Sequence, residues 1–278
     1  MPVLPRYYPR AMRWFPARAA HWRKIVRYGA MPTTAHGDIT AVRLRLPAAH
    51  PAVRGLRIAF FSDTHAMADP LLERIFRQAA EVVAAFDPDY LLCGGDFSGY
   101  ASQMKACWPM LASFAPCRAV KLAVEGNWET RKEWIPHAYW QEHLAEHGFR
   151  LLKHELFFDG RLALYGMGDY DYPVPPPRWP EEPCERIVLV HNPDVLIAAP
   201  ETDRRPFLAF SGHTHGGQVR LPLVGPVAGA SLYGRRFDAG IFRHRETGSQ
   251  MLLSAGLNHL SFPLRLGCRR EVILLTLV

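Results

Sequence analysis

Long apolar runs are absent from this sequence. No stretch reaches the roughly 18 apolar residues that span a bilayer, and the first residues lack the apolar core of a secretory signal. These absences argue against a membrane-spanning or secreted protein. We therefore expect a cytoplasmic location, with peripheral association at the inner membrane as a further expectation from the features described below.

Cysteines are few, and their spacing suggests no pairing. The chain contains five, an odd number, and none of them forms a C-x-x-C motif. Neither a disulfide framework nor a zinc site built on thiolates is indicated. A reducing compartment is the simplest interpretation. The cysteines are Cys93, Cys107, Cys117, Cys184 and Cys268.

Acidic residues are absent from residues 1–37, where seven Lys or Arg residues lie. The rest of the chain has 26 basic and 26 acidic residues, so the net charge of +7 comes from this segment. A nucleic-acid-binding protein is expected to carry its basic residues over one face of its fold. We therefore expect no nucleic acid partner, and instead a contact between one end of the chain and an anionic surface.

The chain divides into a basic, aromatic N-terminal segment, residues 1–37, and one domain, residues 38–278. With 49% hydrophobic and 21% charged residues, the composition is that of a globular protein with a large core. Within the segment, Trp22, Ile25 and Val26 fall near one face at helical spacing, opposite basic residues. This pattern predicts an interfacial helix that brings residues 1–30 to an anionic membrane surface. The alternative is a helix packed on the body of the protein.

Beyond residue 38 the pattern alternates between strands and helices, which predicts a layered α/β fold. A proline-rich stretch, Asp169–Pro183, is predicted to be a loop with a functional role. Helices are expected at Leu71–Phe86, Met104–Phe114 and Trp134–His147. Strands are expected at Leu56–Phe61, Asp89–Cys93, Val120–Val124, Leu162–Tyr165, Ile187–Val190, Phe207–Phe210, Met251–Ser254 and Val272–Leu277.

Polar side chains collect just after five of these strands. In open α/β sheets ligands bind beyond the carboxyl ends of the strands. Each residue alone has an ordinary structural interpretation, such as a turn or a cap, but together they form a mixed oxygen and nitrogen ligand set. Such a set suits two Mn, Fe, Zn or similar divalent ions that share a carboxylate. The residues are Asp63, His65, Asp96, Asn127, Glu129, His191, His213 and His215.

The order of these motifs resembles the calcineurin-like metallophosphoesterase family, over about residues 56–278. The matching motifs are Asp63-Thr-His65, Gly95-Asp96, Gly126-Asn127-Trp128-Glu129, the single His191, and Gly212-His213-Thr-His215. The runs SGHTHGGQVRLP and LSAGLNHLSFPLRLGCRREVILLTL are similar to a bacterial branch of membrane-associated phosphodiesterases.

The resemblance implies a fold, a reaction and a ligand set. The fold is a layered β-sandwich of two mixed sheets flanked by helices, and the substrate is a phosphodiester or diphosphate. A lipid-linked compound at the membrane and a nucleotide are both open alternatives for that substrate. Asp63, His65 and His215 hold one metal ion in the implied set. Asn127, His191 and His213 hold the other, and Asp96 bridges the two. The implied catalytic residues are Asp96, Asn127, Trp128, Glu129 and His213.

Trp128 departs from the family pattern, which has a histidine at this position that is expected to protonate the leaving group or to hold the phosphate. An indole cannot deliver a proton at neutral pH. Three interpretations remain: a weakly active metal-binding scaffold, a different acid, or a leaving group that needs no proton. A phosphate leaving group needs none, and the UDP-2,3-diacylglucosamine pyrophosphatases of lipid A synthesis are relatives that also lack this histidine. A diphosphate of that kind is therefore one specific candidate substrate.

Overall fold

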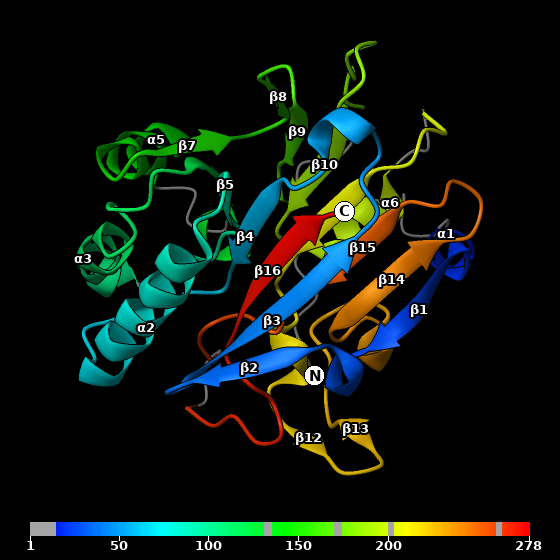
Figure 1. The fold of residues 1–278 in the computed structure, drawn as a ribbon. Coiled ribbons are helices and arrows are strands. Elements are labelled where there is room, and N and C mark those ends of the chain that lie inside the picture. The colour runs from blue at the N-terminus through cyan, green and yellow to red at the C-terminus, as the bar shows by residue number, and fades with distance from the viewer. Residues whose placement is uncertain (1–14, 100, 131–134, 170–173, 200–202, 260–262) are drawn as a thin grey trace.

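The fold consists of two seven-stranded sheets packed face to face, with helices on both outer faces (Figure 1). This computed structural model describes residues 15–99, 101–130, 135–169, 174–199, 203–259 and 263–278. The predicted α/β sandwich of two mixed sheets is confirmed.

The first sheet mixes parallel and antiparallel pairs, and β9, β10, β11 and β15 are its parallel core. Its strand order is β1 (Trp22–Arg27), β14 (Gly240–His244), β15 (Gln250–Leu253), β11 (Leu208–Ser211), β10 (Glu185–Val190), β9 (Leu162–Met167) and β8 (Glu155–Phe158).

The second sheet has a parallel half that runs from β4 to β7. The last strand, β16, lies inside this sheet, parallel to β3 and antiparallel to β4. The strand order is β2 (Thr33–His36), β3 (Ile39–Leu46), β16 (Glu271–Leu277), β4 (Arg57–Phe61), β5 (Tyr90–Cys93), β6 (Val120–Val124) and β7 (Phe149–Leu152).

Three layers of core result from this arrangement. Within β4, Ile58 and Phe60 face the core between the sheets, while Ala59 and Phe61 face the core under the helices. A strand covered on both faces consists of a continuous apolar run. This is why β4 could be predicted as a strand from its sequence. The second sheet is covered by α2 (Pro70–Phe86), α3 (Cys107–Ala112) and α5 (His137–Glu146).

The predicted elements are found, with shifted bounds. The helix expected at Met104–Phe114 is a 3₁₀ turn, Ala101–Ala106, followed by α3, and the described part of the helix expected at Trp134–His147 is α5. No described residue of the predicted loop Asp169–Pro183 lies in a helix or strand. Among the described helices, none has both the length and the apolar character needed to cross a membrane.

The predicted interfacial helix through Trp22, Ile25 and Val26 is wrong. The helix in this region, α1, covers Phe15–His21, and residues 22–27 form the edge strand β1, paired with β14. Its side chains alternate, so that Trp22 is buried whereas Ile25 is exposed. Pairing with β14 outweighs the local helical spacing in this short stretch. Further along, β2 pairs with β3 in the second sheet, so the N-terminal segment contributes one strand to each sheet. Residues 1–14 lie outside the described residues.

We predict that Trp22 contributes to stability as a core residue. Trp22→Ala should lower the free energy of unfolding by about 3 kcal/mol, the usual cost of truncating a large buried aromatic side chain. The matched control is Ile25→Ala on the same strand, which should change it by less than about 0.5 kcal/mol because that side chain is exposed. Urea unfolding followed by circular dichroism measures both, and equal effects would contradict the assignment of this strand.

Candidate metal centre

The predicted ligands meet where the carboxyl ends of strands from both sheets come together. Asp63 and His65 follow β4, Asp96 follows β5, and Asn127 begins the short helix α4 (Asn127–Thr130) after β6. From the other sheet, His191 follows β10, and His213 and His215 follow β11. Asp63, Asp96, Asn127 and three of the four histidines are buried, and His213 is half-buried.

Five of these residues have a left-handed backbone, which is unusual for residues other than glycine. The φ angles are +54° at Asp63, +36° at His65, +56° at Asp96, +72° at His213 and +49° at His215. Backbone hydrogen bonds hold part of this geometry, for example from the Asp63 amide to the Gly95 carbonyl at 3.0 Å. Strain of this kind collects at functional sites, where it aims side chains at a common point.

Two glycines allow the loops to approach each other. A Cβ atom at Gly126 would collide with the Asp96 side chain, and one at Gly212 would collide with Ser62 and Asp63. Both glycines belong to the sequence motifs quoted above. The motifs therefore include the residues that let the loops come close as well as the candidate ligands.

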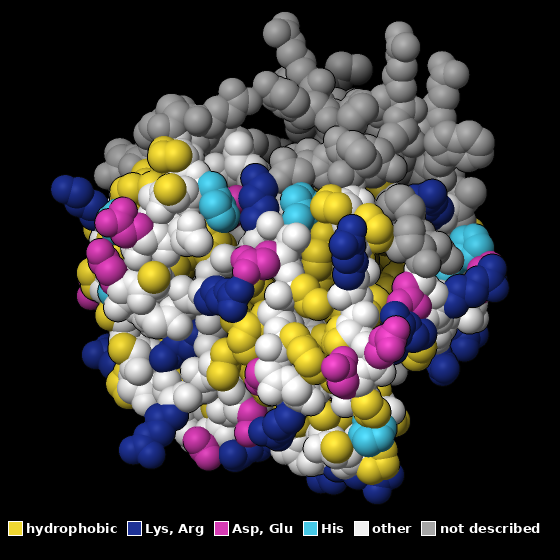
Figure 2. All heavy atoms as spheres, turned by 90° about the horizontal axis from the view of Figure 1, so that it is seen from above, with side chains coloured by type: hydrophobic (Ala, Val, Ile, Leu, Met, Phe, Trp, Pro, Cys, Tyr) yellow, Lys and Arg dark blue, Asp and Glu magenta, His cyan; other side chains and the backbone are white. Residues whose placement is uncertain are grey.

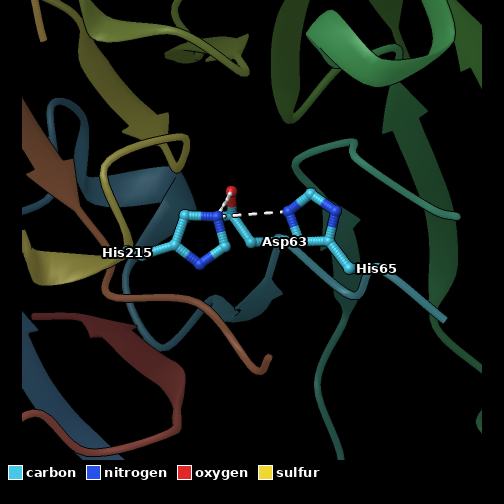
Figure 3. Close-up of side chains that lie close together, drawn as sticks. All are labelled: Asp63, His65 and His215. Carbon is cyan, nitrogen blue, oxygen red and sulfur yellow. Dashed lines mark hydrogen bonds and ion pairs between the residues drawn. The ribbon is translucent and has the colours of Figure 1, made fainter. Parts of the chain in front are cut away.

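The first group of ligand atoms consists of Asp63, His65 and His215, which point toward one another (Figure 3). His65 Nε2 lies 3.1 Å from His215 Nε2, and His215 Nε2 lies 3.4 Å from Asp63 Oδ1. On the other side of its ring, His215 Nδ1 donates to the Asn258 carbonyl oxygen at 3.0 Å. This hydrogen bond leaves the Nε2 lone pair of neutral His215 directed at the group.

The second group consists of Asn127, His191 and His213. Asn127 Oδ1 lies 3.1 Å from His191 Nε2 and 2.7 Å from His213 Nδ1, and these two nitrogens are 3.3 Å apart. His191 Nδ1 donates to the Gly94 carbonyl oxygen at 2.7 Å, so its Nε2 also faces the group. A hydrogen bond on the far nitrogen is the usual way in which proteins orient a histidine that ligates a metal.

Asp96 lies between the two groups. Its Oδ2 atom is 3.4 Å from His65 Nε2 in the first group and 3.3 Å from His191 Nε2 in the second. Its other oxygen, Oδ1, accepts a hydrogen bond from the Trp128 backbone amide at 2.9 Å. One carboxylate oxygen therefore faces both groups at once.

Burial and mutual attraction determine the charges of these side chains. Burial lowers the pKa of His65 to about 4 and that of His213 to about 3. Burial also acts to lower the pKa of His191, but the Asp96 carboxylate outweighs it and raises this pKa to about 10. For Asp96, burial acts to raise the pKa, yet the His191 imidazolium holds it well below its usual range. At neutral pH the cluster itself thus contains one imidazolium, His191, among carboxylates and neutral imidazoles.

This donor set fits divalent cations. Imidazole nitrogens, carboxylate oxygens and an amide oxygen lie 2.7–3.4 Å apart. Lone pairs at such distances repel unless a proton or a cation lies between them. Mixed oxygen and nitrogen ligands suit Mn, Fe and Zn. Asp63, His65 and His215 form one candidate set of metal ligands, and Asp63, Asp96 and His191 form another.

Glu129 positions the loops of the site. Its Oε2 atom accepts hydrogen bonds from the backbone amides of Asp96 and Gly126, and its Oε1 atom accepts one from Phe97, each at 2.9 Å. A single buried carboxylate thus ties the loop after β5 to the loop after β6. The motif Gly-Asn-Trp-Glu therefore contains a ligand candidate and the residue that holds it in place.

Trp128 forms an aromatic wall beside the first group. Its indole lies edge-on to the His65 imidazole, with ring centroids 5.6 Å apart and an interplanar angle of 81°. The side chain is half-buried, so one part of it packs on the ligands and another part remains open to solvent. The residue that replaces the expected histidine therefore lies at the site.

Asn258 is a positioning residue that the motif analysis did not identify. Its amide donates to the Asp63 carbonyl oxygen, its Nδ2 donates to the His65 carbonyl oxygen, both at 3.0 Å, and its carbonyl accepts from His215. Arg265 Nε in turn donates to the Asn258 carbonyl at 3.0 Å. Both lie in the closing run quoted for the resemblance, but no spacing rule connects residue 258 with residues near 64. Only the fold brings them together.

Comparison with known proteins places the chain among metallophosphoesterases. The sequence profile of the calcineurin-like phosphoesterases matches residues 56–217. The chain is 30% identical to phosphodiesterase YaeI of Escherichia coli (strain K12) over 273 residues, 96% of this chain and 98% of that protein. It is 39% identical to the uncharacterized metallophosphoesterase YkuE of Bacillus subtilis (strain 168) over 92 residues, 33% of this chain and 30% of that protein.

The family match begins at the first strand that carries ligands and ends just after His215, so it covers the candidate centre. The near full-length relative extends the similarity over almost the whole chain. The fold, the buried carboxylate and imidazole groups, and these similarities agree: the chain belongs to the calcineurin-like phosphoesterase family and is a metal-dependent phosphoesterase.

Proposed function

We propose that the protein is a dinuclear-metal phosphohydrolase in which Asp96 bridges the two ions. In this assignment Asp63, His65 and His215 bind one ion, and Asn127, His191 and His213 bind the other. The observation that carries it is the position of Asp96 Oδ2, within 3.4 Å of a histidine nitrogen in each group. An oxygen that lies close to both groups is in the position of a carboxylate shared by two ions.

Bound divalent ions polarise phosphoryl oxygens and lower the pKa of the attacking water. The protein's own contribution is to hold the ligand atoms in place before substrate arrives. Gly94 and Asn258 fix two imidazoles, Glu129 fixes the two loops, and the buried surroundings keep electrostatic forces strong. The chain therefore supplies orientation and a shaped charge distribution, which are the main requirements of phosphoryl transfer.

The substrate class follows from Trp128. The residue lies beside the ligands and has an N–H group that does not ionise near neutral pH, so it cannot protonate a leaving alkoxide. We therefore infer a diphosphate or an activated phosphodiester, whose leaving group departs without a proton. A membrane-associated, lipid-linked diphosphate is the specific candidate. Activity on diesters is supported by the similarity to the relative described as a phosphodiesterase.

A substitution of the bridging residue tests the dinuclear assignment. Asp96→Ala should lose both ions and reduce turnover of an aryl phosphodiester by more than about 100-fold, since the carboxylate belongs to both sites. Asp63→Ala and His213→Ala should each weaken mainly one ion. Glu81→Ala, an exposed acid in an ion pair with His36, is the control and should retain full activity. Metal analysis of the dialysed proteins gives the number of bound ions per chain. Retention of both ions in Asp96→Ala would rule out Asp96 as the ligand that the two ions share.

Metal affinity should increase with pH. The pKa of His191 near 10 means that its ring carries a proton at neutral pH, and ion binding at Nε2 must release that proton. The metal-free protein therefore binds about one more proton than the loaded protein. The apparent affinity should rise about tenfold per pH unit between pH 6 and 8. His65 and His213 are already neutral there and add nothing. Calorimetric titrations in buffers of different ionisation enthalpy measure the proton release, and an affinity independent of pH would contradict ligation by His191.

Restoring the family histidine tests the substrate class. Trp128→His should accelerate substrates with poor leaving groups by about 10²-fold or more, because general acid catalysis helps only leaving groups that need a proton. The measurement is log rate against leaving-group pKa, which should be steep for the native enzyme and shallower for Trp128→His.

Trp128→Phe is the matched control, since it keeps an aromatic wall without any acid, and its slope should remain steep. A shallow slope in the native enzyme would show that another residue supplies the proton. His137, whose Nδ1 lies 3.0 Å from Glu125 Oε1, would then be the first candidate for substitution.

A further inference from the structure

A short hairpin directly after the His213–His215 loop exposes a group of apolar side chains. It consists of β12 (Arg220–Leu221) and β13 (Gly225–Pro226), and it projects from the lower end of the molecule in Figure 1, away from both large sheets. At its tip, Leu223 is 108% exposed and Val224 is 58% exposed. Nothing in the described part of the chain covers the leucine.

A second segment extends this apolar surface. The Arg220 amide donates to the Leu266 carbonyl oxygen at 2.7 Å, and the Leu266 amide donates to the Gln218 carbonyl oxygen at 3.1 Å. This pairing places Leu264 and Leu266, both exposed, next to the base of the hairpin. We call the hairpin together with residues 264–266 the apolar tip. Contiguous exposed apolar groups of this kind mark interaction or membrane surfaces.

The backbone at the tip is strained, and the exposed Leu223 side chain gains no burial that would offset this strain. Leu223 has a φ of +65°, and the Val224 amide donates to the Pro222 carbonyl oxygen at 2.7 Å across it, a tight turn that is strained for a branched residue. Glycine or asparagine would relieve this strain. A leucine held there at full exposure is in the position needed to enter an apolar medium outside the protein.

Basic residues surround a groove beside the tip. The groove, of about 1070 Å³, is lined by Lys24, Arg27, Arg220 and Arg269 together with Leu223. Asp238 pairs with Lys24 and Arg220, and Glu271 pairs with Arg269. The four basic side chains thus outnumber the two acids that face them. By contrast, acidic and basic side chains are interspersed on the face seen from above in Figure 1 (Figure 2).

We propose that the apolar tip and the basic groove dock the protein on an anionic lipid bilayer. The leucine and valine side chains enter the headgroup and acyl boundary, and the groove receives lipid phosphates. The charge of the groove favours an anionic partner, and the exposed leucine and valine beside it favour a bilayer over a soluble anion. A second copy docked across a two-fold axis would present the same excess of basic residues. Apolar groups that insert next to Lys and Arg are the common requirement for binding at such an interface. This inference rests on the proposed function and deepens it by naming the surface through which the enzyme meets a lipid-linked substrate. Of the predicted membrane contact of residues 1–30, it uses Lys24 and Arg27 in the groove and adds the apolar tip.

Binding of the full chain to vesicles tests the proposal. With vesicles of phosphatidylglycerol and phosphatidylcholine in equal parts, Leu223→Asp should weaken binding about tenfold or more, the loss expected for one inserted leucine. Aspartate tolerates the left-handed backbone better than leucine, so the variant should fold. Val278→Asp is the matched control, because that valine is 41% exposed at the C-terminus, far from the hairpin in Figure 1, and its binding should be unchanged.

The role of the groove is tested by a separate vesicle-binding experiment. Arg27→Gln should weaken binding to the anionic vesicles about fivefold, and it should not change the weaker binding to pure phosphatidylcholine. Added salt should reduce the difference between Arg27→Gln and the native protein. Equal binding of the native protein to both kinds of vesicle would overturn the role of the groove.

Other outcomes overturn the proposal as a whole. If Leu223→Asp binds vesicles as well as the native protein while deletion of residues 2–14 abolishes binding, the membrane contact lies in the N-terminal residues. If native protein is a dimer in sedimentation velocity, Leu223→Asp is monomeric and vesicle binding is equal, the tip is a subunit interface. Because binding requires no turnover, inactive Asp96→Ala should still bind vesicles. Loss of the proposed function and loss of the docking surface are thus observed separately.

Discussion

The structure depends on one constraint: seven polar side chains, the candidate metal ligands, are held against each other at the junction of two sheets. Two carboxylates, one amide and four imidazoles converge there, and most of them are buried. Such a cluster resists folding unless protons or cations occupy its centre. The surrounding fold overcomes this resistance through strained backbone at Asp63, Asp96 and His213, glycines at the closest approaches, and Glu129 as a clamp between loops. The sandwich is therefore a rigid support that keeps these atoms together before any ion binds.

The central strands and the convergence of the candidate ligands were predictable because each carries a local signal. Strands such as β4 and β6 are short apolar runs, and the ligands follow them within a few residues, so neither inference needs knowledge of distant contacts. The edge strand β1 was not predictable in this way. Trp22, Ile25 and Val26 have helical spacing, and pairing with β14, more than 200 residues away in sequence, determines the outcome. The same limit applies to Asn258, whose role depends on contacts with Asp63, His65 and His215 that no sequence spacing indicates.

Trp128 connects the chemistry of the centre with the choice of substrate. Its backbone amide holds Asp96 Oδ1, so the residue supports the bridging carboxylate whatever its side chain is. The side chain is thereby free to change without loss of the ligand set, which explains how a complete set of ligands coexists with the missing histidine. A scaffold that had lost its activity would have no reason to retain seven candidate ligands, the hydrogen bonds behind them and the strained loops. In the proposed function, the substitution would narrow the leaving groups that the site can release and would leave the binding of ions intact.

The candidate centre and the apolar tip are joined by only a few residues. The hairpin begins three residues after Gly217, and Arg220 Nη1 donates to the Gly216 carbonyl oxygen at 2.7 Å next to His215. Arg220 also pairs with Asp238, and the backbone carbonyl of Asp238 accepts a hydrogen bond from the Thr214 hydroxyl between the two histidines. A surface that docks on lipid through this hairpin is therefore tied to the loop that supplies His213 and His215. Because the link is short and hydrogen-bonded, docking would fix the distance between the bilayer and the metal centre, so that a phosphate close to the membrane surface is the one presented for cleavage.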